Sequence, residues 1–340
     1  MPVHDHPPSS AAEVVDVVAP DRGLAPVSVV IPTYRRAEYL QAALDSVFGQ
    51  TRPPREVIVV DDGSPDDTAA RLAPLAQAGR IRYVRQANAG MSAARNAGAA
   101  LATSKYLLFL DDDDLLVPTA LAWLVDEIER DPAVGFVYGD AVLFSGAVPP
   151  IEDAPDAVAA PADLAVFLVF NRIGSPGQAL VRRAAFEAVG RWRNQFTNVE
   201  DWDLWLKLLA RYPARGAQRP VLAYRLHEHN ISRNMVGKYV SSLSIARLHL
   251  AALPPDRRPI VQALSHSRLR RYHAPHLAEM FGAALRDRQW TRARRAGLTW
   301  VRAWMVEGTA LVAMKAHLVR QGRWRLHPDD PARALYLTQY

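Results

Sequence analysis

The sequence predicts an α/β fold with a mostly parallel central sheet flanked by helices, followed by a helical C-terminal region. Three observations support this prediction. Short β-branched runs alternate with helical patterns over the first two thirds of the 340-residue chain. Polar loops follow several of these runs, as at the carboxyl ends of parallel strands, where such sheets bind ligands. Beyond Lys238 the chain changes to Arg-rich segments whose apolar residues recur at helical spacing.

The composition supports a sizeable core and excludes some kinds of site. Hydrophobic residues make up 49% of the chain, which is enough for one large domain and an accessory one. The absence of cysteine excludes disulfides and thiolate metal sites. No apolar run reaches the length of a membrane span, and the first residues lack the basic start of a signal peptide. We therefore expect a cytoplasmic protein.

Three regions are predicted along the chain. Residues 1–25 are rich in Pro, Ala and Asp without a stable period, so we expect a flexible leader. Residues 26–237 form the α/β domain, and residues 238–340 form the helical, Arg-rich region. This last region carries 18 Lys and Arg against 6 Asp and Glu, a charge of +12. Because the whole chain is +6, the remainder is −6, and the two parts are expected to have different partners.

The first half of the α/β domain opens with a buried strand over residues 27–31. Pro32 ends it, because proline has no amide hydrogen to donate to a strand ladder. The next segment has apolar residues at helical spacing, and Asp66 and Asp67 open a later helix at its positively polarised end. By the same criteria, strands are expected at 56–60, 81–84 and 106–110, and helices at 40–47, 91–102 and 118–129.

The second half is expected to continue with a strand at 136–140 and a Pro- and Ala-rich loop over 146–161. A helix beginning at Glu200 is indicated by the apolar face formed by the residues Trp202, Trp205, Leu206 and Leu209. The remaining predicted elements are helices at 162–172 and 183–189 and strands at 178–181 and 218–225.

The strand at 106–110 runs directly into four aspartates, Asp111 to Asp114. Crowded carboxylates raise one another's pKa unless something offsets the charge, and a divalent cation with oxygen ligands is the usual offset. The alternative is a solvated acidic turn at a helix N-terminus. The other polar loops also follow strands, so all of them should lie on one edge of a parallel sheet. This convergence favours a metal-dependent phosphate or nucleotide site.

Several motifs, in order, resemble those of the family 2 glycosyltransferases, which have the GT-A, Rossmann-like fold. The resemblance covers roughly residues 27–233 and is specific for the family but not for the sugar. The matching stretches are Val27–Tyr34, Val60–Ser64, Asn88–Asn96, Leu110–Asp114, Glu200–Trp205 and Tyr224–Ser232.

The resemblance implies roles for individual residues. Asp113 and His227 would hold Mn²⁺ or Mg²⁺, and Asp201 would be the catalytic base. Asp112 stands where many relatives carry a small neutral residue, which leaves the division of labour between Asp112 and Asp113 open. The donor nucleotide would contact Pro32, Thr33, Tyr34, Arg36, Asp61, Asp62, Asn88, Gly90, Arg95, Asp111 and Asp112.

The roles that the resemblance implies for acceptor binding have the least support from the sequence. They would involve Ser175, Trp192, Glu200 and Trp202. Ordinary packing and helix capping explain each of these residues equally well, because acidic residues favour the first turn of a helix and tryptophans at this spacing are often core.

The implied function is inverting transfer of a sugar from a nucleotide-sugar donor, with UDP- or dTDP-hexose favoured, to a hydroxyl acceptor. A cell-surface glycan, a lipid-linked intermediate or a small molecule would be the acceptor, as in polysaccharide biosynthesis. Two alternatives stay open: a nucleotidyltransferase and a non-catalytic sugar-nucleotide-binding protein. The loop at Pro32–Arg36 contains no glycine, which argues against a triphosphate-binding loop.

The basic C-terminal region has several interpretations. It could contact anionic lipid headgroups, so that the protein is peripheral at the inner membrane face, or an anionic lipid-linked acceptor. It could also be a merely solvated surface, or form a homodimer through Trp300, Trp304 and Leu311. Nucleic acid is not expected, since no binding motif is evident.

Overall fold

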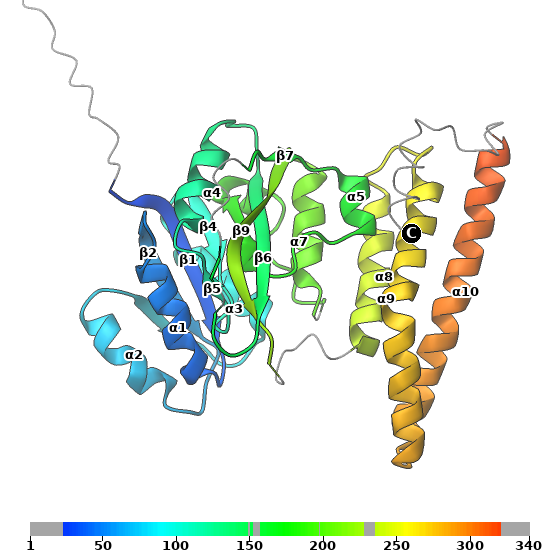
Figure 1. Cartoon of the computed structure of the whole chain (residues 1–340), viewed down its shortest axis with the longest axis horizontal. Coiled ribbons are helices and arrows are strands. Elements are labelled where there is room, and N and C mark those ends of the chain that lie inside the picture. Colours follow the sequence, from blue (N-terminus) through cyan, green and yellow to red (C-terminus); the bar gives the residue numbers. More distant parts are fainter. Residues whose placement is uncertain (1–22, 149, 152–156, 197, 228–234, 321–340) are drawn as a thin grey trace, which may run out of the picture.

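The computed structural model describes residues 23–148, 150–151, 157–196, 198–227 and 235–320. Figure 1 shows an α/β part built on one sheet and, beside it, a bundle of long helices. The predicted leader lies almost entirely outside the described residues. So does the segment 228–234, which contains the end of the last matching motif.

A single sheet of nine strands organises the described α/β part, in the order β3-β2-β1-β4-β8-β6-β9-β5 with β7 on β9. The strands are β1 (Ala25–Thr33), β2 (Pro54–Asp61), β3 (Arg82–Arg85), β4 (Tyr106–Phe109), β5 (Leu115–Leu116), β6 (Phe136–Phe144), β7 (Ala160–Pro161), β8 (Ala179–Arg182) and β9 (Ala214–Arg225). The four strands β3, β2, β1 and β4 are mutually parallel, and β8 then pairs antiparallel to both β4 and β6. The predicted fold class is confirmed.

The parallel register brings the predicted polar loops together. Thr33 at the end of β1 is opposite Asp61 at the end of β2, and Asp61 is opposite Arg85 at the end of β3. Leu110, just past β4, donates its amide to Val30 of β1 at 3.0 Å. The aspartates that follow Leu110 therefore lie at the same sheet edge as the β1 and β2 loops.

Helices cover both faces of the sheet because β1 alternates between them. Val29 and Ile31 pack with α1 (Ala37–Phe48) and α4 (Ala120–Glu129), whereas Val30 packs with α3 (Met91–Leu101). The other helices of this part are α2 (Thr68–Gln77), α5 (Leu164–Val169), α6 (Arg183–Ala188) and α7 (Glu200–Leu209), with a short 3₁₀ turn at Pro176–Gln178.

Up to residue 320, where the described part ends, the C-terminal region consists of three long helices: α8 (Met235–Leu250), α9 (Arg258–Arg286) and α10 (Trp290–Arg320). Helices α5 and α7 lie between the sheet and α8–α9 (Figure 1). A buried polar contact fixes this arrangement, since Asp203 of α7 lies 2.8 Å from the His249 Nε2 of α8. None of the helices within the described residues is both long and apolar enough to cross a membrane.

Several element boundaries differ from prediction, and β1 continues through Pro32 to Thr33. Two of the differences have clear local reasons. The helix predicted at 162–172 is the shorter α5, which begins after Asp163 because that side chain accepts hydrogen bonds from the amides of Ala165 and Val166, and which ends where Phe170 becomes extended. The strand predicted at 218–225 begins earlier, at Ala214, because pairing with β6 extends it. The two-residue strands β5 and β7 depend on tertiary pairing with β9 and carry no period in the sequence.

Gly98 provides a test of how closely α3 packs on the sheet. A Cβ atom at this position would lie 2.4 Å from Val30 Cγ1 and 3.1 Å from Val60 Cγ2. We therefore expect Gly98→Ala to lower the free energy of unfolding by about 1–3 kcal/mol, through overpacking. The measurement is denaturant unfolding followed by circular dichroism.

Gly282→Ala in α9 is the matched control, because an added Cβ there would meet only Arg286 Nη1 at 3.6 Å. This helical substitution should raise stability by up to about 1 kcal/mol. Equal gains in both variants would contradict the close contact between α3 and the sheet.

Candidate active site

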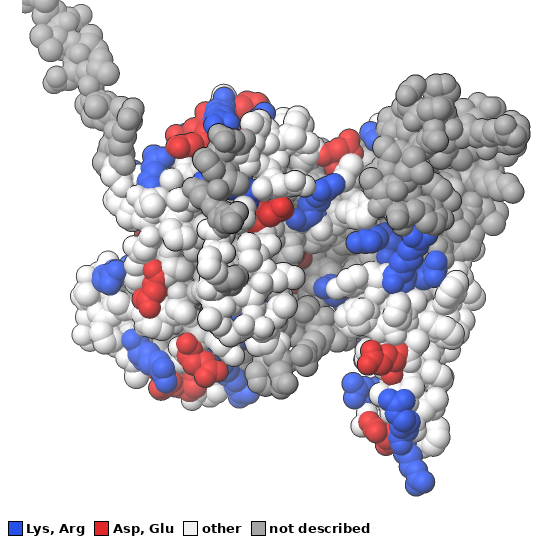
Figure 2. All heavy atoms as spheres, in the orientation of Figure 1, with Lys and Arg blue, Asp and Glu red and all other residues white. Residues whose placement is uncertain are grey.

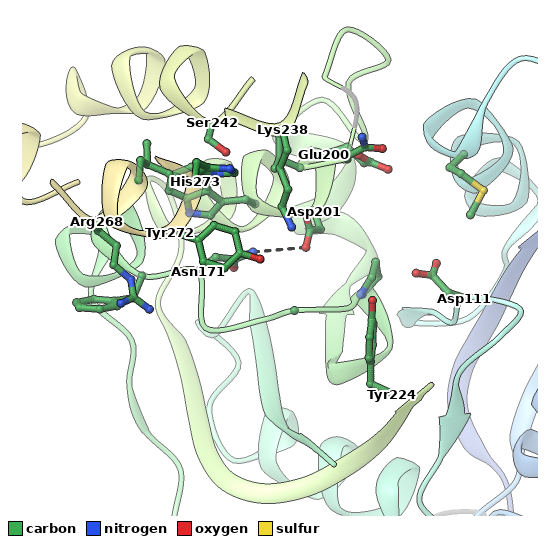
Figure 3. A pocket seen from close by; sticks show the side chains of 18 of the residues that line it. Asp111, Asn171, Glu200, Asp201, Tyr224, Lys238, Ser242, Arg268, Tyr272 and His273 are labelled. Atoms are coloured by element: carbon green, nitrogen blue, oxygen red, sulfur yellow. Dashed lines mark hydrogen bonds between the residues drawn. The ribbon is translucent and has the colours of Figure 1, made fainter. Parts of the chain in front are cut away.

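A pocket of about 390 Å³ opens at the carboxyl edge of the parallel strands. One side is formed by Asp111 and Asp113, and another by Glu200 and Asp201 at the start of α7. Helices α8 and α9 form the far wall, as Figure 3 shows. The pocket therefore joins the end of the sheet to the helical region, and it brings the predicted base within the same cavity as two of the predicted donor-side aspartates.

Arg95 of α3 connects two sides of this pocket. Its guanidinium donates to Asp111 Oδ1 at 2.6 Å and to Glu200 Oε1 at 3.3 Å, and it lies 4.7 Å from the centre of the Trp192 ring. Burial disfavours the charge of Arg95, but the two carboxylates outweigh burial and raise its pKa. The predicted donor-site residue thus holds Asp111 and the first turn of α7 in fixed relation.

Asp112 and Asp113 have different environments, although they are adjacent. Asp112 is buried and accepts hydrogen bonds from Thr33 Oγ1 at 2.7 Å and from Arg36 Nη1 at 3.2 Å. Burial raises the pKa of Asp112 to about 7, with the charge of Asp113 adding to the effect and Arg36 opposing it. Asp113 instead borders the pocket, so the two acids are not equivalent.

Asp113 contacts two predicted partners of the donor site. Arg36 Nη1 donates to its Oδ2 atom, and His227 Nε2 lies 2.8 Å from the same oxygen. The His227 ring stacks on Tyr39 of α1, with 5.0 Å between ring centres. Within the part of the chain that the structure describes, no three acidic or histidine side chains are grouped as a metal site.

Asp114 points away from the pocket and braces the loop. It accepts hydrogen bonds from Ser175 Oγ at 2.7 Å and from the Arg225 amide at 3.1 Å. Burial, together with the charges of Asp111 and Asp113, raises its pKa well above the usual value. The structure thus uses this last aspartate to connect the loop to β9 and to the turn before β8.

Two aspartates at the end of β2 hold its loop and the segment before α3. Asp61 accepts hydrogen bonds from the Ser64 amide and the Tyr83 hydroxyl, both at 2.7 Å. Asp62 accepts from the amides of Ala89 and Gly90, at 2.9 and 2.8 Å. Gly90 has φ +89°, a left-handed conformation that suits glycine. These contacts fix the entry to α3, and with it the position of Arg95.

The remaining predicted donor contacts lie on these loops rather than in the pocket itself. Pro32 and Thr33 are buried at the end of β1, Tyr34 is half-buried and Asn88 is exposed. The structure brings their loops to the same edge as Asp111, as the parallel order requires. Their contacts with a nucleotide stay a prediction.

Among the acidic side chains that border the pocket, Asp201 has the weakest hydrogen bonding to other side chains. Asn171 Nδ2 lies 3.5 Å from its Oδ2 atom, the contact drawn in Figure 3, and the Lys238 side chain extends toward it. Burial and the adjacent Glu200 raise the pKa of Asp201 to about 7, while the Trp202 amide, Lys238 and Arg95 oppose the rise. A carboxyl with this pKa can accept a proton near neutral pH.

The predicted acceptor residues divide into two pairs. Glu200 and Trp202 border the pocket, and the Trp202 Nε1 donates to the Phe167 carbonyl at 2.7 Å. Ser175 and Trp192 are buried, at 1% and 3% exposure, and do not border it. An acceptor contact by either of the buried residues stays a prediction.

Several pocket residues were not predicted from the sequence. They come from the loop after α5 and from α8 and α9, and they are Asn171, Lys238, Ser242, Arg268, Tyr272 and His273. The basic charge of residues 238–340 was the available signal, but it does not indicate which basic residues face the sheet domain. Only the docking of α8 and α9 against α5 and α7 does so.

Comparisons with known proteins agree with this geometry. The family model for glycosyl transferase family 2 matches residues 28–190. A protein of Haemophilus influenzae described as an uncharacterized glycosyltransferase is 30% identical over 191 residues, which are 54% of this chain and 62% of that protein. The chain thus spans less than two thirds of that relative.

Two solved structures share the fold. Staphylococcus aureus TarS 1–349 in complex with UDP-GlcNAc has a TM-score of 0.58 at 15% identity, covering 90% of this chain and 98% of that one. The mannosyltransferase PcManGT of Pyrobaculum calidifontis, in complex with GDP-Man and Mn²⁺, has a TM-score of 0.52 at 21% identity, covering 87% and 89%. At these identities the likeness establishes the GT-A fold.

Asp201→Asn tests the environment of the pocket carboxyl through stability. A folded-state pKa of about 7, against about 4 in the unfolded chain, means that ionised Asp201 disfavours folding. This cost is absent below about pH 4, grows as the pH rises to about 7 and then levels off. The asparagine variant should therefore be more stable than the parent by roughly 1–3 kcal/mol at pH 8.

The measurement is the free energy of unfolding of both proteins from pH 4 to pH 8. Asp126→Asn serves as control, because that carboxyl is exposed and pairs only with Arg52 at 3.3 Å among the described residues. A gain for Asp201→Asn that does not change with pH would show that its carboxyl has an ordinary pKa.

Proposed function

We propose that the chain, whose residues 28–190 match the model for glycosyl transferase family 2, is an inverting, metal-assisted glycosyltransferase. The observation that carries the proposal is the position of Asp201. It faces Asp111 and Asp113 across one pocket, with a pKa of about 7. A donor diphosphate at the aspartates and an acceptor hydroxyl at Asp201 would then meet inside the cavity.

The proposed reaction is a single displacement. The acceptor hydroxyl oxygen bonds to the anomeric carbon of the donor while the bond from that carbon to the phosphate oxygen breaks. The hydroxyl proton passes to an Asp201 carboxylate oxygen, and the nucleoside diphosphate leaves with the electron pair. One carboxylate base is enough for this inversion, unlike the two carboxyls that flank the bond in glycosidases.

The donor would lie along the sheet edge. The β1 and β2 loops, with Asp61 and Asp62, would accommodate the nucleoside, and Asp111 the ribose. Arg95 is already neutralised by Asp111 and Glu200, so its proposed part is to position these two groups. UDP- or dTDP-hexose remains the favoured donor. The UDP-GlcNAc and GDP-Man complexes of the structural neighbours support a nucleotide-sugar but not a particular base.

The residues at the pocket fit a divalent cation. Asp113 supplies a carboxylate oxygen at the pocket, and one or two carboxylates suffice for Mg²⁺ or Mn²⁺ when substrate phosphates complete the shell. Of the two adjacent acids we assign Asp113 as the main ligand, because Asp112 is buried against Thr33. His227 would join Asp113. The cation would act as a Lewis acid that stabilises charge on the leaving diphosphate.

A donor panel tests the proposal. The chain is incubated with Mn²⁺ and UDP-, dTDP-, GDP- and CMP-sugars, and released nucleotide is measured. We expect release from one donor class, and Asp201→Asn should lower the rate about 10²- to 10⁴-fold, as for loss of a general base. Donor affinity should stay close to that of the parent.

Asp126→Asn is again the control and should retain full activity. Near-parental turnover by Asp201→Asn would overturn the base assignment. Donor binding without release would favour the non-catalytic alternative. Pyrophosphate release from a nucleoside triphosphate and a sugar phosphate would favour a nucleotidyltransferase.

We further propose that α10 makes peripheral contact with an anionic membrane. Among the α10 residues whose burial the structure describes, the large exposed apolar side chains are Trp290, Leu298, Val301, Trp304 and Met305, each at least 47% exposed. Trp300, in contrast, packs against α8 and α9, and so leaves the proposed dimer surface with less apolar area. Exposed basic residues of the same helix are Arg292, Arg294, Arg295 and Arg302. Figure 2 shows Lys and Arg, with a few Asp and Glu among them, on the helical part of the face drawn. Apolar side chains among basic ones suit anionic headgroups.

Vesicle sedimentation tests this contact. The full chain should bind phosphatidylglycerol vesicles at low salt and not phosphatidylcholine vesicles. Leu298→Glu with Met305→Glu should weaken binding by about ten-fold or more, because charges replace buried apolar area. Leu143→Glu, at an equally exposed apolar residue of β6, should have no effect. Absence of binding, with dimers that the double variant abolishes, would favour self-association instead.

A further inference from the structure

The far wall of the pocket has a charge pattern that the donor chemistry does not use. Arg36 and Arg95 border the pocket beside the sheet, and each pairs with carboxylates there. Lys238 of α8 and Arg268 of α9 also border it, and among the described residues neither lies within 4.0 Å of a carboxylate oxygen, although Lys238 extends toward Asp201 and its charge lowers the pKa of that carboxyl. The two ends of the cavity therefore differ in how their cations are balanced.

The cations of the far wall are accompanied by aromatic rings. Lys238 Nζ lies 5.6 Å from the centre of the Tyr272 ring, and the Arg268 guanidinium lies 4.9 Å from that of Phe170. Tyr272 is 47% exposed, so one of its faces is accessible to a ligand. Figure 3 shows Lys238, Tyr272 and Arg268 along the wall that α8 and α9 form. An aromatic face beside cations suits a sugar ring that carries a negative charge.

His273 also lies at this wall, beside Lys238. Its ring borders the pocket at 1% exposure, and its Nδ1 atom is buried with no hydrogen-bond partner among the described residues. Burial, with the charges of Lys238 and His276, lowers the pKa of His273 to about 3. The histidine is therefore neutral at pH 7, and the positive charge beside it belongs to Lys238.

We infer that α8 and α9 form the acceptor subsite, and that the positive charges of Lys238 and Arg268 on its wall favour an acceptor that carries an anionic group while its hydroxyl lies at Asp201. The inference rests on the proposed function and specifies its acceptor class. The bound group would be a phosphate or a carboxylate, which share the oxygen acceptors that ammonium and guanidinium groups prefer. Lys238 would serve both the acceptor anion and the carboxylate of the base.

A binding experiment tests this subsite without requiring the natural acceptor. The full chain is first saturated with Mn²⁺ and the nucleoside diphosphate that binds best, so that the donor site is filled. Four probes are then titrated separately into the protein, and their affinities are measured by calorimetry. Glycerol 3-phosphate is compared with glycerol, and methyl glucuronide with methyl glucoside. We expect at least one anionic probe to bind about ten-fold or more tightly than its neutral counterpart.

Variants assign the binding to the far wall. The double substitution Lys238→Met with Arg268→Met should lower the affinity for the anionic probe about ten-fold or more and leave the affinity for the neutral probe unchanged. Arg286→Met, an exposed arginine of the same helix α9, is the matched control and should change neither. All variants should still bind the nucleotide, and this binding serves as the control that they are folded.

Two results would overturn the inference. One is an anionic probe that binds no better than its neutral counterpart, and the other is anion binding that persists in the double variant. If no nucleoside diphosphate binds, the proposed function fails instead, and the same titration on the chain alone still tests Lys238 and Arg268. Comparing glycerol 3-phosphate with methyl glucuronide shows whether the subsite prefers a phosphate or a carboxylate.

Discussion

The paired hydrogen bonds of Arg95 are the interaction on which the candidate site depends. One guanidinium bonds to Asp111 after β4 and to Glu200 at the start of α7, two carboxylates that lie far apart in the sequence. Arg95 itself is placed by the entry to α3, where Asp62 binds the amides of Ala89 and Gly90. The position of α7, and therefore of the proposed base, is thus fixed from the β2 loop through one buried cation.

This arrangement explains why the acidic side chains around the pocket differ in their pKa values. The fold crowds acidic groups at one place, and the described cations that border its sheet side are already paired with some of them. Asp201 has only a weak contact with Asn171 and lies next to Glu200, so burial raises its pKa to about 7. A cation placed between Asp201 and Glu200 would remove this cost, but it would also remove the basicity that proton transfer requires. The proposed function is thus supported by a feature that destabilises the fold.

The sequence was sufficient for the sheet and for its functional edge, but not for the whole pocket. Strand periodicity and the order of the polar loops predicted that Asp61 and Asp111 would lie together, because parallel strands end at one edge. The approach of Asp201 to that edge followed only from family resemblance, since spacing along the chain does not position a helix. The burial of Asp112 was not predictable either, because its partner Thr33 becomes adjacent only through the pairing of β1 with β4. Helices α8 and α9 showed an apolar period, which indicates that they pack but not against what.

Helix α7 relates the two ends of the pocket to each other. Asp201 faces the cavity, whereas Asp203, two residues later, is fully buried and contacts His249 of α8 and Arg193. Ser242 lies two helical turns before His249 and therefore on the same face of α8, toward the pocket. The contact between Asp203 and His249 consequently fixes the position of α8 relative to the proposed base. The aspartates after β4 are held by separate partners on α3 and β9. If α8 and α9 bind the acceptor as proposed, substitutions on them should change acceptor binding without moving the donor-side aspartates, which are held by Thr33, Arg95, Ser175 and the Arg225 amide.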